Sequence, residues 1–178
     1  MTKKISFRKA QNTDAPIIRG FWANPKIMAP IGFPLGLKKT TKQVEESIAG
    51  YDHPDAAFLL ILDEENEPIG EFCFERLNER VFQFDIKIGN VDKQGYGYGF
   101  AAVEKGIALI FKNFTCQQIQ LDVNATNNVA LNLYEKVGFQ IVQKHVNSWV
   151  DQQNKRRDSI ELTLTKKAWQ TNKNCLVE

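Results

Sequence analysis

The chain has 178 residues, of which 43% are hydrophobic and 25% are charged, a composition typical of a globular domain with a sizeable core. Its formal net charge of +2 is too small to indicate a nucleic-acid or membrane surface, and no apolar run approaches a membrane span. Three widely spaced cysteines, Cys73, Cys116 and Cys175, and only two histidines exclude a disulfide framework and a multi-histidine metal centre. We therefore expect a cytoplasmic protein with no metal and with neither nucleic acid nor membrane as partner.

Hydrophobic spacing predicts a mixed α/β chain without internal repeats. The expected elements are, in chain order, a strand over residues 5–9, a helix capped near Thr13 or Asp14, an irregular loop over 25–37, a short helix opened by a capping box at 40–43, strands over 57–62, 69–77 and 81–88, a helix over 100–114, a strand over 120–123, a helix over 128–137, and strands over 139–146 and 160–165. The last two strands flank a polar connection that contains Trp149 and the basic run 155–157.

A glycine-rich turn, Gln94 to Gly99, joins the strand over 81–88 to the helix that follows it. Glycines at a helix start let the backbone turn tightly, so that the unpaired amides of the first turn can face an anion such as a pyrophosphate. A dinucleotide fingerprint would require glycine where Phe100 stands, and a Walker loop would require Gly-Lys-Ser/Thr. The remaining interpretations are another kind of phosphate loop or a glycine-rich turn without a ligand.

Two motifs resemble the GNAT superfamily of N-acetyltransferases. Gln94, Gly97 and Gly99 match the Gln/Arg-x-x-Gly-x-Gly/Ala acyl-CoA loop of that superfamily, and residues 127–139 resemble its N-x-x-A-x-x-L-Y-E-K-x-G-F signature. The order of the elements is also similar from end to end. The resemblance implies an α/β (α+β) fold with a mixed central sheet of about seven strands flanked by about four helices, in one GNAT domain over residues 1–170 followed by a C-terminal tail over 171–178.

The implied activity is acetyl-CoA-dependent N-acetyl transfer to a primary amine by direct attack in a ternary complex. The acceptor stays open among protein N-termini, polyamines, amino acids and drugs, and the protein is expected to be a monomer or homodimer. The segments 24–28, 157–162 and 168–169 look like the ribosomal-protein N-terminal acetyltransferase branch. A catalytically silent acyl-CoA sensor is the alternative function, whereas a nucleic-acid adaptor that uses the basic run 155–157 is disfavoured by the low net charge.

The resemblance also implies roles for particular residues. Tyr134 is the expected acid for the departing thiolate, although an ordinary buried aromatic would fit the same helical face. The base is left open among Asp85, Glu71 and ordered water, with solvated strand carboxylates as the alternative interpretation. The residues expected to bind the cofactor are Ile86, Lys87, Ile88, Gln94, Gly95, Tyr96, Gly97, Tyr98, Gly99, Asn124 and Asn127. Phe33 and Trp149 are expected to contact the acceptor.

Overall fold

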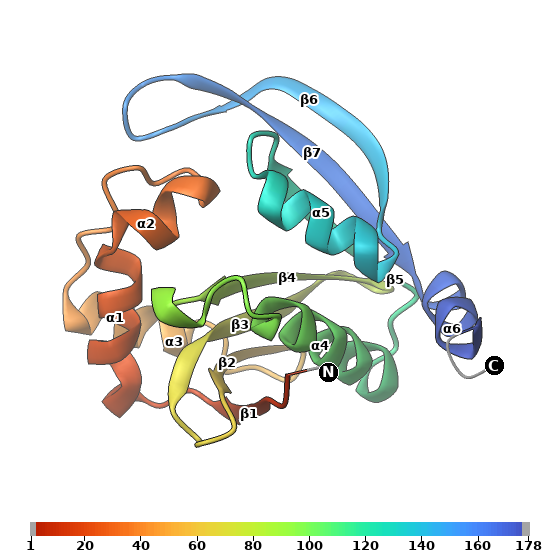
Figure 1. Cartoon of the computed structure of the whole chain (residues 1–178), viewed down its shortest axis with the longest axis horizontal. Helices are drawn as coiled ribbons and strands as arrows, with labels where there is room; N and C mark the ends of the chain where they lie inside the picture. Colours follow the sequence, from red (N-terminus) through yellow and green to blue (C-terminus); the bar gives the residue numbers. More distant parts are fainter. Residues whose placement is uncertain (1–2, 176–178) are drawn as a thin grey trace.

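The structure is a computed structural model that describes residues 3–175. One seven-stranded sheet has the order β1-β2-β3-β4-β5-β7-β6 (Figure 1). Its strands are β1 (Ser6–Lys9), β2 (Ala56–Leu62), β3 (Pro68–Asn78), β4 (Val81–Ile88), β5 (Gln118–Asn124), β6 (Gln140–Val150) and β7 (Arg156–Thr165). The helices are α1 (Ala15–Ala23), α2 (Pro25–Met28), α3 (Thr41–Ala49), α4 (Tyr98–Asn113), α5 (Asn128–Val137) and α6 (Lys166–Cys175), with 3-10 turns η1 (Asn12–Asp14), η2 (Ala29–Ile31) and η3 (Val91–Lys93). The predicted fold class, a mixed α/β sheet flanked by helices, is confirmed.

Alternating side chains divide the core into two layers, one on each face of the sheet. On one face, Phe72 and Phe82 are buried beneath α4 and α5. On the other face, Phe58 and Leu60 pack against α1 and α3. The period of two along each strand explains both layers, because successive side chains point to opposite faces. Among the helices over residues 3–175, none combines the length and apolarity that a membrane crossing requires.

The two parallel strands at the centre of the sheet separate soon after they meet. β4 and β5 pair only at Val81 with Gln118 and at Phe82 with Ile119. Beyond this point β4 continues to pair with β3 as far as Ile88, and β5 continues to pair with β7 as far as Asn124. The backbone of β4 from Phe84 onward therefore has no partner strand on its β5 side, and the sheet opens along this line.

Two local predictions were wrong. The segment 25–37, expected to be irregular, begins with α2 and η2, because the Asn24 side chain accepts from the Lys26 amide at 3.0 Å and Pro25 occupies the first helical position. The polar connection after β6 is also shorter than expected, so that Trp149 lies in β6 and Arg157 in β7. The Asp151 carboxylate accepts from the amides of Gln153 and Lys155 and so holds a tight turn between the two strands.

The last described helix, α6, runs through position 170, where the domain was expected to end. Trp169 is buried against Phe111 of α4, with ring centroids 5.3 Å apart. The helix therefore packs on the domain at least as far as this residue. Residues 176–178 of the expected tail lie outside the described part of the chain.

Candidate active site

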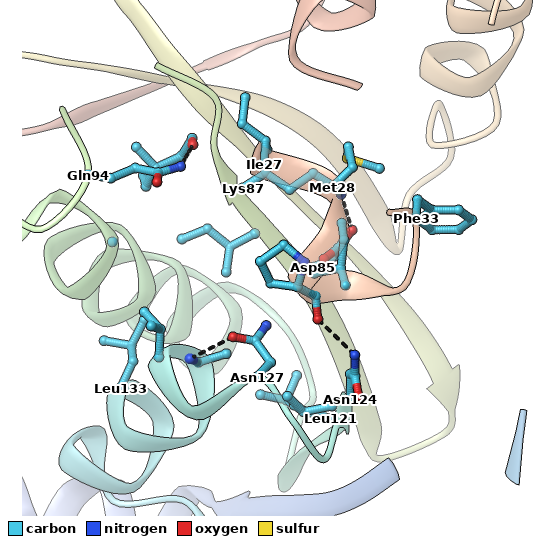
Figure 2. A pocket seen from close by; sticks show the side chains of 18 of the residues that line it. Ile27, Met28, Phe33, Asp85, Lys87, Gln94, Leu121, Asn124, Asn127 and Leu133 are labelled. Carbon is cyan, nitrogen blue, oxygen red and sulfur yellow. Dashed lines mark hydrogen bonds and ion pairs between the residues drawn. The ribbon is translucent and has the colours of Figure 1, made fainter. Parts of the chain in front are cut away.

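The opening between β4 and β5 forms a cavity of about 590 Å³. Its walls come from β4 and β5, from the glycine turn and α5, and from the segment formed by α1, α2 and η2. Figure 2 shows Ile27, Met28 and Phe33 beside Asp85 on one side of the hollow, with Gln94 on the other. Eleven of the residues singled out in the sequence line this cavity: Phe33, Asp85, Ile86, Lys87, Ile88, Gln94, Gly95, Gly99, Asn124, Asn127 and Tyr134.

The glycine turn is built to leave backbone donors free. Gly95 and Gly97 have φ of +77° and +90°, values that favour glycine. Gly97 is the N-cap of α4, whose first backbone bond runs from the Ala101 amide to the Gly97 carbonyl at 3.1 Å. Within residues 3–175, no acceptor is recorded for the amides from Gly95 to Phe100. The helix dipole adds to these donors, so the turn suits an anion.

The glycine turn has free space beside Gly95, and the neighbouring residues Gln94 and Tyr98 attach it to the rest of the domain. A Cβ atom added at Gly95 would meet nothing within 4 Å. The side-chain amide of Gln94 donates from Nε2 to the Ile88 carbonyl at 2.7 Å and links the turn to the end of β4. The Tyr98 side chain is buried and turned away from the cavity, with its hydroxyl donating to Glu64 at 2.7 Å. Tyr96 is 67% exposed, and neither tyrosine ring lines the cavity.

A buried ion network supports the β4 wall. Glu71 of β3 pairs with Lys87 of β4 in the strand register and is fully buried. Its carboxylate oxygens lie 2.9 and 3.0 Å from Nε1 of Trp22, which donates to them, and one of them lies 3.0 Å from Nζ of Lys87. Lys87 also pairs with Asp85, whose side chain is 54% exposed. Of the two expected base candidates, only Asp85 lines the cavity, and Glu71 lies behind it.

Burial and charge set the ionisation of this network. Burial raises the pKa of Glu71, and Lys87 and the Trp22 donor offset that effect only in part. Burial alone would lower the pKa of Lys87, but Asp85 and Glu71 outweigh it and raise the pKa above the ordinary lysine value. We conclude that Lys87 is an ammonium at neutral pH, held between two carboxyl groups.

Tyr134 comes from the helix on the opposite wall. Its ring is buried and packs edge-on against Phe84 of β4 at a centroid distance of 5.8 Å, and against Phe139 at 5.6 Å. Burial raises the pKa of its phenol. The hydroxyl is therefore protonated at neutral pH and can act as a proton donor.

Two asparagines hold the segments at the edge of the cavity. Asn127 caps α5, and its Oδ1 accepts from the Ala130 amide at 3.2 Å, which leaves its Nδ2 as the donor without a recorded partner in the described chain. Asn124 at the end of β5 donates to the Pro30 carbonyl at 3.1 Å. This bond joins β5 to η2, so Asn124 fixes the segment that closes the cavity (Figure 2).

Trp149 lies outside the cavity and supports its wall. Figure 1 shows the long β6–β7 hairpin arching over α5 toward α2. A Cβ atom added at Gly32 would lie 2.3 Å from Cη2 of Trp149, so the ring packs directly on this glycine. Gln152 at the hairpin end donates to the Gly36 carbonyl at 2.9 Å and accepts from the Leu35 amide at 3.1 Å. The hairpin thus contacts and holds in place the loop that carries Phe33.

Several lining residues were not singled out in the sequence. They are Trp22, Lys26, Ile27, Pro30, Leu37, Phe84, Leu121, Asp122, Val123, Val129, Ala130 and Leu133. Asp122 carried a readable signal, because it is the polar residue between Leu121 and Val123 in a strand that precedes the second motif. Trp22 carried none, because its partner Glu71 is 49 residues away.

These features fit acetyl-CoA. The free amides of the glycine turn suit its pyrophosphate, and the unpaired β4 backbone from Phe84 onward suits an extended amide-bearing arm. Asp85 and Tyr134 can accept and donate protons in the same cavity. Among residues 3–175, no group of histidine, cysteine and acidic side chains could hold a metal ion.

Comparison with known proteins agrees with this assignment. Residues 4–140 match the acetyltransferase (GNAT) domain family. The spermidine N-acetyltransferase from Vibrio cholerae in complex with CoA and spermine has a TM-score of 0.82 at 20% identity, over 93% of this chain and 98% of that chain. A putative phosphinothricin N-acetyltransferase has a TM-score of 0.76 at 18% identity, over 91% and 98% of the two chains. At these identities the solved structures show a shared fold, and the comparison with curated protein sequences gives no match. Because the family match extends over most of the chain, the chain belongs to the GNAT superfamily and is an N-acyltransferase that uses acetyl-CoA as its co-substrate.

Proposed function

We propose that the chain transfers the acetyl group of acetyl-CoA directly to a primary amine in a ternary complex. One observation carries the proposal: Asp85 and Tyr134 line the same cavity as Gln94, Gly95 and Gly99 of the glycine turn. A proton acceptor, a proton donor and an anion-binding turn are the groups that such a reaction requires. The reaction needs no covalent acyl-enzyme, and this agrees with the burial of the thiols of Cys73 and Cys116, which are not required as nucleophiles.

Asp85 acts as the base in this proposal. An acceptor that arrives as an ammonium gives one proton to the Asp85 carboxylate, and the freed lone pair attacks the thioester carbon. The carbon–sulfur bond then breaks, Tyr134 gives its proton to the departing thiolate, and water restores the phenol. The nitrogen loses its second proton to solvent as the amide forms. The exposure of Asp85 supports exchange of its proton with water.

Glu71 acts as a positioning residue in this proposal. Its oxygens already accept from Trp22 and pair with Lys87, and it is fully buried behind the wall. An incoming ammonium therefore cannot reach the oxygens of this carboxylate. Its function is to hold the Lys87 ammonium at Asp85.

The acceptor class remains a small or terminal primary amine, such as a polyamine, amino acid, drug or protein N-terminus. The spermidine and phosphinothricin acetyltransferases among the structural neighbours support an amine acceptor. The segments 24–28 and 157–162 support the ribosomal-protein N-terminal acetyltransferase branch within the family. Free thiols at Cys73 and Cys116 support a cytoplasmic location, where thiols stay reduced.

The test is the Tyr134→Phe variant, which keeps the buried ring and removes only the hydroxyl. We expect kcat to fall by about 10²–10⁴-fold, the usual contribution of a general acid, with acetyl-CoA affinity unchanged by titration calorimetry. Tyr98→Phe is the matched control, because it removes a phenol hydroxyl that points away from the cavity. Wild-type kcat in Tyr134→Phe would reduce Tyr134 to a core aromatic. Calorimetric binding of acetyl-CoA with no CoA release for any amine would favour a silent sensor.

A further inference from the structure

A second hollow of about 200 Å³ adjoins the acetyl-transfer cavity on the α3 side of the sheet. The two hollows share the wall residues Phe84, Asp85, Leu121 and Asp122. They therefore meet at Asp85, the proposed base. A molecule whose reacting nitrogen lies at Asp85 has room to extend into the second hollow.

The charged side chains that line this second hollow are all acidic, and Lys87, which pairs with Asp85, lines the first cavity and not this hollow. Its lining carries the carboxylates of Glu75, Asp85 and Asp122, and it includes no lysine or arginine. Glu75 is held in place by Gln83, which donates to it at 2.7 Å. The Asp122 carboxylate has no hydrogen bond or ion pair within residues 3–175. Such a lining attracts a cation and disfavours an anion.

Two further features of the lining point to a ligand with an aliphatic body. Tyr51, which follows α3 and packs edge-on against Phe58 at a ring-centroid distance of 5.8 Å, supplies an aromatic wall. The Cys73 thiol is 5% exposed, lines the hollow and has no recorded hydrogen-bond partner in the described chain. Burial raises the pKa of this thiol, so it adds no charge. Methylene groups could pack on these surfaces without leaving a polar group unpaired.

The strand register sets the spacing of the acidic groups. Cys73 pairs with Asp85, and Glu75 pairs with Gln83, two residues further along the same face. Two residues of a β-strand span about 7 Å. Glu75 therefore lies one such step from the row that contains Asp85, a separation that a short methylene chain can bridge.

We propose that the acceptor is an aliphatic amine with a second ammonium group, which binds in this hollow between Glu75 and Asp122 while the first nitrogen reacts at Asp85. The proposal rests on the proposed function for the reacting end and adds a subsite for the other end. The second ammonium stays charged through the reaction, because no proton acceptor is required there. Glu75 and Asp122 are thus specificity-determining residues.

The test compares linear α,ω-diamines with 1-aminoalkanes of the same carbon number. We expect kcat/KM of the wild type to favour the diamine by about tenfold or more, the usual effect of one charge-assisted hydrogen bond. Glu75→Gln and Asp122→Asn should each reduce this preference toward unity. Glu75 does not line the acetyl-transfer cavity, so Glu75→Gln should also leave kcat/KM for the monoamine within about twofold. Glu46→Gln, on the exposed side of α3, is the matched charge control and should change neither value. Equal kcat/KM for both amines in the wild type would overturn the proposal.

A binding measurement separates this proposal from the proposed function. Calorimetric titration of the diamine into the CoA complex should show affinity that Glu75→Gln weakens by about tenfold, whether or not any amine is acetylated. Binding without turnover would remove the proposed reaction and keep the subsite. Turnover of both amines with no affinity difference between diamine and monoamine would remove the subsite and keep the reaction. A Glu75→Gln protein with unchanged diamine affinity would also overturn the subsite.

Discussion

Replacing Glu71 by glutamine tests whether this buried carboxylate is a support or a base. The substitution keeps the shape and one oxygen for the Trp22 donor, but it removes the charge that faces Lys87 at 3.0 Å. Both side chains are nearly inaccessible, with 1% of Glu71 and 9% of Lys87 exposed. Removing one partner of such a pair costs about 3–5 kcal/mol, and because Lys87 keeps Asp85 we take the lower value, about 3 kcal/mol. For a chain of this length that loss lowers Tm by about 6–12 °C.

The assay combines urea denaturation with steady-state kinetics at a temperature where both variants are folded. Glu71→Gln should lose stability and keep kcat within about tenfold, whereas Asp85→Asn should lose about 10²–10⁴-fold in kcat with a smaller change in stability. Glu46→Gln on exposed α3 is the control for loss of a surface carboxylate. If Glu71→Gln has the stability of the wild type but loses kcat as Asp85→Asn is expected to, Glu71 is the base and our assignment is refuted.

Three further changes test other parts of the site. Gly99→Val should fold, because a Cβ there makes only ordinary contacts at 3.7 and 3.8 Å with Leu133 and Ile88. The valine methyl groups enter the cavity, so we expect the affinity for acetyl-CoA to fall by about tenfold or more. Unchanged calorimetric affinity in a folded protein would contradict this. Burial opposes the charge of Lys87, but Asp85 and Glu71 outweigh it and raise the pKa of Lys87. The stabilisation by this charge is complete below the unfolded pKa of about 10.4 and is lost as the pH rises above it toward the folded pKa. Between about pH 10.4 and about pH 12 the wild type should lose more unfolding free energy than Lys87→Met, and parallel losses would contradict a charged Lys87. Gly32→Ala forces a Cβ to 2.3 Å from Trp149 at φ +109°, so the acceptor KM should rise while the affinity for acetyl-CoA stays intact. Adding Trp149→Ala to the same chain should bring the acceptor KM part of the way back to the wild-type value. A wild-type acceptor KM in Gly32→Ala would show that the hairpin does not position the loop.

Most strands and helices could be predicted because one side of each is buried. Phe82 and Phe84 are buried between the more accessible Val81, Gln83 and Asp85, and the predicted bounds of β4 agree with the structure. The β6–β7 hairpin was harder because most of β6 is exposed on both faces, including Ile141 and Val146. Without a buried face there is no alternation to read. The hairpin turn depends instead on the local bonds of Asp151.

The site was predictable where its residues are close in sequence. The glycine turn and the helix that begins after Asn127 are local motifs, and their residues meet at the cavity. Contacts between distant segments left no local pattern. Trp22 reaches Glu71, and Trp149 packs on Gly32, only because the sheet brings α1 to β3 and the β6–β7 hairpin to η2. These contacts place Glu71 behind the cavity wall and the Trp149 ring against Gly32, outside the cavity.

The two ends of the cavity have opposite electrostatic character, and this matches the two substrates. At one end the free amides from Gly95 to Phe100 and the start of α4 present partial positive charge to an anionic pyrophosphate. At the other end, Lys87 lies between Glu71 and Asp85, so two carboxyl groups face one ammonium. Glu71 is buried behind the cavity wall, and its oxygens already contact Trp22 and Lys87. We therefore propose that an incoming ammonium meets the carboxylate of Asp85, which lines the cavity. In this proposal the acyl donor and the acceptor bind at separate ends of the cavity, with the proton acceptor on the acceptor's side.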